Sequence, residues 1–198
     1  MDSDRDVLDR WRAGDQAAGH QLFSHHFDSL YRFFSNKCRE PDDLIQSTFL
    51  AIVKARDQFE GRSSFRTYLF TIARHELHRH LREVQRSARF DPALSSIADI
   101  VTGAGSRLAR HEEHRSLFAA LRTLPIDTQT LVELHYWEQL DAPVLAEIFE
   151  VPAVTIRMRL NRARTALREA MAGSGAPAAA MRSDEDLERW ARTAVAAR

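Results

Sequence analysis

The chain contains few of the residues that interrupt or cross-link a fold. Of its 198 residues, one is cysteine, seven are glycine and six are proline. With Cys38 alone, an intramolecular disulfide is impossible and a thiolate-rich metal site is disfavoured, so nothing supports secretion. No apolar run approaches the roughly 20 residues that span a bilayer, and Met1–Arg12 lacks a signal-peptide core. We therefore expect a cytoplasmic protein without membrane insertion.

The net charge is zero, but the charges are unevenly distributed along the chain. In residues 1–60, eleven acids stand against eight lysines and arginines. Residues 61–89 hold seven arginines and two acids, and residues 152–168 hold five arginines and no acid. Two basic segments separated by a neutral stretch indicate nucleic-acid binding that the total charge hides.

The hydrophobic pattern predicts an all-α protein, because apolar residues recur at three- and four-residue spacing without sustained alternation. The first predicted domain, 1–90, holds a short helix ending near Gly14 and then longer ones. These are expected over residues 16–34, 41–59 and 64–89. Pro41 with the acids that follow it suits a first helical turn, and Ser64 is expected to cap the last helix. The second helix is expected to bury Leu22, Phe23, Phe27, Leu30, Tyr31 and Phe34.

The rest of the chain is expected to form a linker, a second helical domain and a tail. Residues 91–110 are rich in glycine, serine and small residues and are predicted to be a flexible linker. The second domain, 111–172, is predicted to contain four helices, broken near Pro125, at 141–143 and at 151–152. Residues 173–198 form a spacer and a C-terminal amphipathic helix, which either docks on the chain, binds a partner or remains weakly helical.

The long helix after Ser64 has two different faces. Phe65, Leu69, Ile72, Ala73 and Leu77 share one side, as a packed stripe would. Thr67, Thr71, Arg74, His78 and Arg82 lie roughly opposite, with His75 and Arg79 on a flank. Basic side chains neutralise phosphates, and the neighbouring Tyr68 and Phe70 are expected to supply aromatic surface for unstacked bases. An ordinary solvated helix face is the alternative.

A second two-faced helix lies in the last basic segment. A short helix, 144–149, precedes a turn at 150–152 and a longer helix in which Ile156, Leu160, Ala163 and Leu167 share a narrow arc. Arg157, Met158, Asn161, Arg162 and Thr165 point the other way. This is the helix-turn-helix arrangement, and arginine and asparagine suit guanine and adenine edges. A plain helical hairpin is the alternative.

Several motifs together resemble the extracytoplasmic-function sigma factors of the sigma-70 family. Region two of that family is similar to Ala13–Ala18, Leu30–Phe33, Asp42–Leu50 and Phe65–Arg74. Region four is similar to Leu121–Pro125, Leu145–Ile148, Val151–Pro152 and Thr155–Arg164. The resemblance covers about residues 6–171, in the family's order. It implies two small helical domains joined by a linker, and a non-enzymatic RNA polymerase subunit that directs transcription initiation, for a stress- or signal-responsive regulon.

The resemblance also implies which residues bind which partner. Core polymerase would dock on the helix from Asp42, through Asp43, Gln46, Ser47, Leu50 and Lys54. The single-stranded −10 element would be captured by Gly61, Arg62, Ser63, Ser64, Phe65, Arg66, Thr67, Tyr68, Thr71, Arg74, His75, His78 and Arg79. The duplex −35 element would be read by Thr155, Arg157, Met158, Asn161 and Arg162, with Arg159 and Arg164 on phosphates. An anti-sigma factor or another regulator is a further expected partner.

Four features depart from the family's usual pattern. Glu150 and Val154 stand where glycine is common, so a positive φ at Glu150 would cost on the order of 1 kcal/mol. Ser47 replaces a usual glutamate, and 173–198 extends the chain.

Other functions have weaker signals. The pairs His75–His78 and His111–His114 lack a third ligand, so we expect no metal, and no cofactor or catalytic motif is evident. A helix-turn-helix regulator that acts without polymerase, or an adaptor that binds only protein, are the competing hypotheses. The first domain argues against the regulator, and the outward arginines of two separate helices argue against the adaptor.

Overall fold

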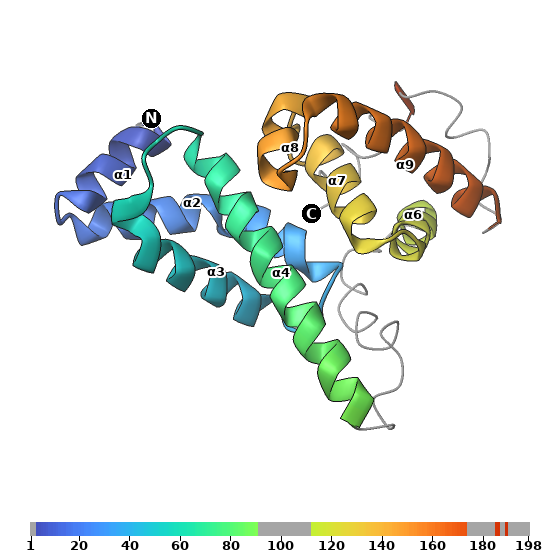
Figure 1. Ribbon diagram of the computed structural model, residues 1–198, viewed down its shortest axis with the longest axis horizontal. Helices are drawn as coiled ribbons and strands as arrows, with labels where there is room; N and C mark the ends of the chain where they lie inside the picture. Colours follow the sequence, from blue (N-terminus) through green and yellow to red (C-terminus); the bar gives the residue numbers. More distant parts are fainter. Residues whose placement is uncertain (1–2, 91–111, 174–184, 187–188, 190–198) are drawn as a thin grey trace. The chain divides into compact units, whose positions relative to one another are not determined.

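The computed structural model describes residues 3–90, 112–173, 185, 186 and 189, and all regular structure in this part of the chain is helical (Figure 1). The chain divides into two compact units, Met1–Thr102 and Gly103–Arg198. The predicted all-α class is confirmed. The predicted linker, and nearly all of the predicted C-terminal helix, lie outside the described residues. None of the described helices is long and apolar enough to cross a membrane.

The described residues of the first unit, 3–90, form four α-helices and one short 3₁₀ turn. These are α1 (Asp4–Arg12), α2 (Gln16–Ser35), α3 (Pro41–Ala55), η1 (Arg56–Gln58) and α4 (Phe65–Phe90). α1 packs on α2, while α2, α3 and α4 pack on one another. The third predicted helix ends earlier than expected, at Ala55, because the chain tightens into η1, where the carbonyl oxygen of Arg56 accepts hydrogen bonds from Arg12.

Short side-chain motifs define where these helices begin. Ser3 and Asp6 form a reciprocal capping box at α1, and Asp15 accepts from the Ala18 amide (3.2 Å) at α2. Pro41 occupies the first turn of α3, followed by two acids, as predicted. Ser64 Oγ accepts from the Thr67 amide at 3.0 Å, which confirms the predicted cap of α4.

The core of the first unit follows most of the predicted stripes, but Phe23, Tyr31 and Ile72 are only half-buried, and two aromatic residues differ more strongly from their predictions. Leu22, Leu30, Phe34, Leu69, Ala73 and Leu77 are buried. Phe27, expected in the stripe, is 41% exposed, because it lies at the mouth of a hollow between α2 and α3. Phe70, expected to add aromatic surface, is fully buried against Phe33, 5.7 Å between ring centroids. The buried face of α4 is wider than predicted, because this helix packs on both α2 and α3.

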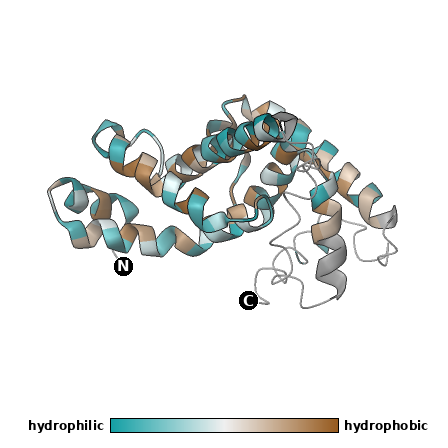
Figure 2. Ribbon diagram, turned by 90° about the horizontal axis from the view of Figure 1, so that it is seen from below, coloured by the Kyte–Doolittle hydropathy of each residue, from teal (hydrophilic) through white to brown (hydrophobic). Residues whose placement is uncertain are grey.

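The second unit contains the four predicted helices. They are α6 (Glu112–Thr123), α7 (Ile126–Tyr136), α8 (Ala142–Phe149) and α9 (Ala153–Gly173). The breaks near Pro125 and at 151–152 fall where predicted, but the third lies at 137–141, because Pro143 occupies the first turn of α8, where proline is tolerated. Asp141 caps α8 by accepting from the Val144 amide at 3.0 Å. The core of this unit includes Phe118, Leu121, Val132, Tyr136, Ala163 and Leu167. Figure 2 shows hydrophobic and hydrophilic residues alternating around the helices, as amphipathic packing requires.

The turn between α8 and α9 contains a strained residue. Glu150 has φ 56° and ψ 42°, the left-handed conformation that its position required. The Val151 amide donates to the Ala146 carbonyl at 3.1 Å, and the Glu150 amide to the Glu147 carbonyl at 3.3 Å. This Schellman-type ending normally uses glycine, which has no Cβ penalty there. The expected strain at Glu150 is therefore present.

A glycine at this position is expected to stabilise the second unit. Glu150→Gly removes the left-handed penalty, which outweighs the added freedom of the unfolded chain, for a net gain of about 0.5–1 kcal/mol. Urea unfolding measures the change. Glu147→Gly, in the helical turn just before, is the control and should destabilise by about 1 kcal/mol. A loss of stability in Glu150→Gly would show that its side chain makes a contact worth more than the strain.

Candidate nucleic-acid interface

The outer face of α9 is the most exposed part of the second basic segment. Ile156, Leu160, Ala163 and Leu167 are buried, as predicted. Arg157, Arg159, Asn161 and Arg162 are exposed, Met158 is 50% exposed, and Thr155 is half-buried. Because α8 packs directly on α9 and ends in a tight left-handed turn, the pair forms a helix-turn-helix. Its second helix therefore presents guanidinium and amide groups outward, the groups that hydrogen-bond base edges in a major groove.

Arg164 makes an interaction that the sequence did not predict. Its Nε donates to the Tyr136 hydroxyl at 2.7 Å, and its Nη1 donates to Asn161 Oδ1 at 3.0 Å. The guanidinium carbon lies 5.9 Å from the centre of the Tyr136 ring. The half-buried Arg164 thus ties α9 to α7 and orients Asn161. The amide oxygen of Asn161 has a second lone pair for a base. The family resemblance implied a phosphate contact for Arg164, and in this structure its guanidinium donates to Tyr136 and Asn161.

The loop before α4 is the exposed part of the first basic segment. Gly61 has φ 70°, a left-handed conformation that glycine adopts without strain. Arg62 is exposed and forms an ion pair with Glu60, while Ser64 is exposed and Ser63 is half-buried. The loop therefore presents one arginine and hydroxyl groups outward, directly ahead of the helix.

Two of the expected base-binding residues, Phe65 and Thr67 in the first turn of α4, are buried in this structure. Phe65 is only 4% exposed, with its ring 5.4 Å from that of the buried His26. Thr67, expected on the outer face, is 3% exposed, and its hydroxyl lies 2.7 Å from Ser64 Oγ in the helix cap. Both residues support the loop from within. Arg66 and Tyr68 are half-buried, with the Tyr68 ring 4.6 Å from the ring of Phe59.

Further along α4, the predicted basic residues remain accessible. His75 and Arg79 are exposed, and Arg79 forms an ion pair with Glu76 one turn earlier. Arg74 and His78 are half-buried. Thr71 is also half-buried, and its hydroxyl donates to the Thr67 carbonyl at 2.9 Å. Arg82, the last basic residue of the face, is exposed. The basic face is thus less exposed than its sequence suggested, and none of its five basic residues is buried.

Burial changes the pKa of several groups in the first unit. It lowers the pKa of His26 below the usual 6.5, although Asp4, 2.8 Å away, favours the charged form. Burial raises the pKa of Tyr68, and it raises the pKa of the Cys38 thiol to about 12. His26 therefore favours its neutral form near neutral pH, and Cys38 lacks the thiolate character of a redox sensor.

One group of described residues has the ligand types of a metal site. Potential ligand atoms of Asp4, His25 and His26 lie within 4.8 Å of one another. No sequence motif predicts this group, because Asp4 and the two histidines are far apart in the chain. His26 is buried and its Nε2 lies 2.8 Å from Asp4 Oδ2 in a hydrogen bond, while His25 is exposed beside it. We assign this group a structural role, as a contact between α1 and α2.

A polar face with one apolar residue lies along α3. Asp43, Gln46 and Lys54 are exposed, Ser47 is half-buried, and Leu50 is 51% exposed. This face borders a hollow of about 300 Å³ between α2 and α3, lined by Phe23, Phe27, Asp42, Ile45, Gln46, Phe49, Leu50 and Val53. An exposed apolar patch with a polar rim is typical of a protein interface. The sequence indicated the α3 face, but the hollow appears only once α2 lies beside it.

Comparisons with known proteins cover both units. Residues 22–87 match the family described as Sigma-70 region 2, and residues 114–167 match Sigma-70, region 4. The RNA polymerase sigma-H factor of Pseudomonas aeruginosa is 27% identical over 184 residues, 86% of this chain and 95% of that protein. The ECF RNA polymerase sigma-E factor of Haemophilus influenzae is 26% identical over 174 residues, 82% of this chain and 92% of that protein.

The fold is also found in a solved complex. The sigma factor RpoE bound to the anti-sigma factor NepR, from Bartonella quintana, has a TM-score of 0.65 and 23% identity to this chain. The match covers 77% of this chain and 96% of that one. At this identity, the likeness shows a shared fold.

Proposed function

Because the chain belongs to the extracytoplasmic-function sigma factors of the sigma-70 family, we propose that its two exposed basic faces bind the two elements of one promoter. Sigma factors bind core RNA polymerase and promoter DNA and direct transcription initiation, and they are not enzymes. The chain is therefore an initiation factor, and its exposed residues divide into those that bind the −35 element, the −10 element and core polymerase.

The −35 element is read by α9. The observation that carries this assignment is the exposure of Arg157, Asn161 and Arg162 on the outer face of the helix-turn-helix. Arginine donates two hydrogen bonds to guanine, and asparagine pairs with adenine, each worth about 1–3 kcal/mol of discrimination. Thr155 and Met158 border this face, and Arg159 is available for a phosphate. Arg164 contributes by orienting Asn161.

The −10 element is captured as a single strand by the loop 61–64 and the accessible part of α4. Arg62 and the serines present donors at the loop, Arg66, Arg74 and Arg79 provide positive charge along the helix, and His75 and His78 provide further hydrogen-bonding groups. Capturing unpaired bases stabilises the melted strand, so binding energy alone drives opening. Tyr68, half-buried beside the loop, is the aromatic residue best placed to contact a base. Phe65 and Thr67 are buried, and they stabilise the loop through packing and through the Ser64–Thr67 hydroxyl contact.

Core polymerase binds the α3 face. Asp43, Gln46, Ser47, Leu50 and Lys54 form a polar rim around an apolar centre, and the adjoining hollow offers further apolar area. In functional terms, we divide the chain into region two at 1–90, a linker at 91–110, region four at 111–172 and a C-terminal extension. A cytoplasmic location follows from the polymerase partner. An anti-sigma factor is a further proposed partner, by analogy with the RpoE–NepR complex.

The loop assignment is tested by single-strand binding. Arg62→Ala is expected to lower the affinity of the assembled holoenzyme for a fluorescent non-template −10 oligonucleotide about three- to tenfold, because the guanidinium no longer binds a phosphate or a base. Anisotropy titration measures it. Arg5→Ala, an exposed arginine on α1, is the matched control and should change nothing. Equal affinities for all three proteins would contradict single-strand capture by this loop.

A further inference from the structure

The first helix lies ahead of the segment that matches the family, yet it is firmly anchored. α1 precedes residues 22–87, the matched part of region two. Its Trp11 is 4% exposed and packs edge-on against Phe23, 5.2 Å between centroids. A Cβ at Gly19 would lie only 2.6 Å from Trp11 Nε1, so the absence of a side chain at Gly19 allows the indole to pack closely on α2. The position of α1 is therefore well defined.

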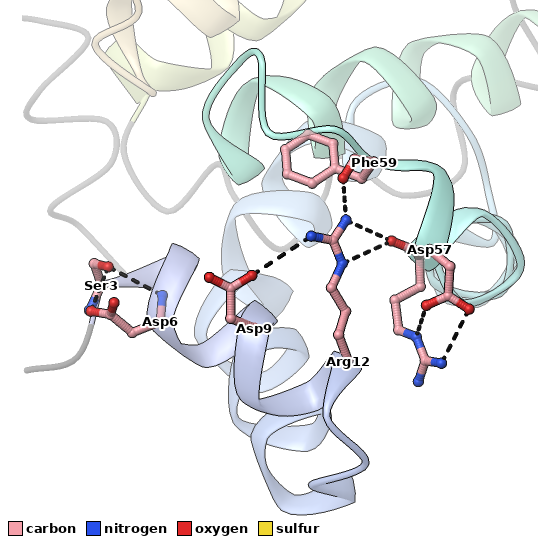
Figure 3. A network of polar contacts seen from close by, with 7 residues as sticks. Ser3, Asp6, Asp9, Arg12, Asp57 and Phe59 are labelled. Carbon is pink, nitrogen blue, oxygen red and sulfur yellow. Dashed lines mark hydrogen bonds and ion pairs between the residues drawn. The ribbon is translucent and has the colours of Figure 1, made fainter.

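From this anchored helix, Arg12 reaches the segment just before the −10 loop (Figure 3). Its Nε and Nη2 donate to the carbonyl oxygen of Arg56, at 3.2 and 2.9 Å, and Nη2 also donates to the carbonyl oxygen of Phe59. Arg12 is half-buried, so these charge-assisted bonds are partly shielded from water. One guanidinium thus holds two carbonyls that are far from it in sequence and close to the loop.

The side chain of Phe59 extends this contact to the far side of the loop. The Arg12 guanidinium lies 5.7 Å from the centre of the Phe59 ring, and that ring lies 4.6 Å from the ring of Tyr68 on α4. Arg56 in turn lies 5.3 Å from the Trp11 ring. The start of the loop is therefore attached both to α1 and, through an aromatic contact, to the helix that follows it.

We propose that Arg12 is a positioning residue for promoter melting, and that α1, through Arg12, holds the start of the −10 loop (residues 61–64) in a fixed position. The inference rests on the proposed single-strand capture by residues 61–64. Arg12 itself does not contact DNA. It fixes the backbone of residues 56–59, so the loop is ordered before a base arrives and capture costs less conformational entropy.

Replacing Arg12 with glutamine is the test, because glutamine is shorter than arginine and lacks both its positive charge and its Nε donor. In Arg12→Gln, amide hydrogen exchange of residues 59–64 in the free chain should rise, and holoenzyme affinity for the −10 oligonucleotide should fall about three- to tenfold. Affinities for core polymerase and for a −35 duplex should stay unchanged. Arg10→Gln is the matched control, since Arg10 pairs with Asp15 at the surface of the same helix.

Two further variants separate positioning from general stability. Arg12→Lys keeps the charge but loses the fork of donors, so it should recover only part of the −10 affinity. Phe59→Leu keeps the backbone carbonyls and removes the ring. Its effect on −10 affinity should combine with that of Arg12→Gln less than additively, because both act on one contact.

The failures of the two proposals are distinguishable. Unchanged amide hydrogen exchange and unchanged −10 affinity in Arg12→Gln would overturn the proposed positioning role of Arg12. An equal loss of core, −35 and −10 binding would overturn it as well. If exchange rises but −10 affinity is unchanged, Arg12 orders the loop without serving promoter melting, and the proposal fails there. If Arg62→Ala is also without effect, the loop assignment itself is wrong.

Discussion

The Leu50→Asp variant is expected to lose about 100-fold or more in affinity for core RNA polymerase, equivalent to about 3 kcal/mol. Leu50 is 51% exposed at the centre of the α3 face and borders the apolar hollow. An aspartate there would replace the apolar centre of this face with a charge that must lose its hydration on binding. It would also add negative charge beside Asp43 and Asp42, both exposed. Fluorescence titration of labelled chain with core polymerase measures the loss.

Folding is expected to survive this change, because the Leu50 side chain is already solvated in the free chain. The matched control is Val154→Asp at the start of α9. It also replaces an exposed apolar side chain, 58% exposed, with a negative charge. It should leave core affinity unchanged. Wild-type affinity in Leu50→Asp would exclude the α3 face as a docking site. An equal loss in both variants would indicate a general effect of charge.

The Arg162→Ala variant is expected to lose about 1–3 kcal/mol of promoter discrimination, a factor of roughly 5 to 150, while core affinity stays unchanged. Arg162 is exposed on the outer face of α9, one residue after the oriented Asn161. Removing a hydrogen bond to a base weakens binding to the preferred −35 sequence more than binding to other sequences. Competition binding of holoenzyme to −35 duplexes that differ at single base pairs measures this selectivity.

Arg159→Ala is the comparison that separates base contacts from phosphate contacts. Arg159 is also exposed, and it is assigned to the DNA backbone. Its removal should weaken binding to all duplexes by a similar factor and reduce the salt dependence of binding. If Arg162→Ala also weakened all sequences equally, Arg162 would be a phosphate contact, and the reading of bases would lie elsewhere on α9.

Much of the fold and of the second basic face could be predicted from the sequence. Periodicity located the helices and their buried stripes, and short motifs such as Pro41 and Ser64 located their starts. The spacing of Arg157, Asn161 and Arg162 predicted their exposure, because a helix with one buried arc has one outward face. The left-handed Glu150 was expected because its position in the turn usually needs glycine. The comparisons confirm the family that the motifs resemble.

The remaining features depend on contacts between distant residues. Phe70 is buried because α4 packs on two helices, and Phe27 is exposed because α2 borders a hollow. A helical wheel of a single segment contains no information about these neighbours. The role of Arg12 has no sequence signal, since its acceptors are backbone carbonyls far along the chain. Lys37 is fully buried, which the sequence also did not predict. Its Nζ donates to the Phe33 carbonyl and lies 4.4 Å from the centre of the Phe33 ring.

Run-off transcription with purified core polymerase tests the central claim most directly. Core polymerase alone, and core with this chain, would be offered a pool of DNA fragments from the genome that encodes it. We predict discrete transcripts only when the chain is present, absent with Leu50→Asp and reduced with Arg162→Ala. No transcripts from any fragment, while the chain alone still binds duplex DNA specifically, would contradict a promoter held at two elements by a polymerase-bound factor.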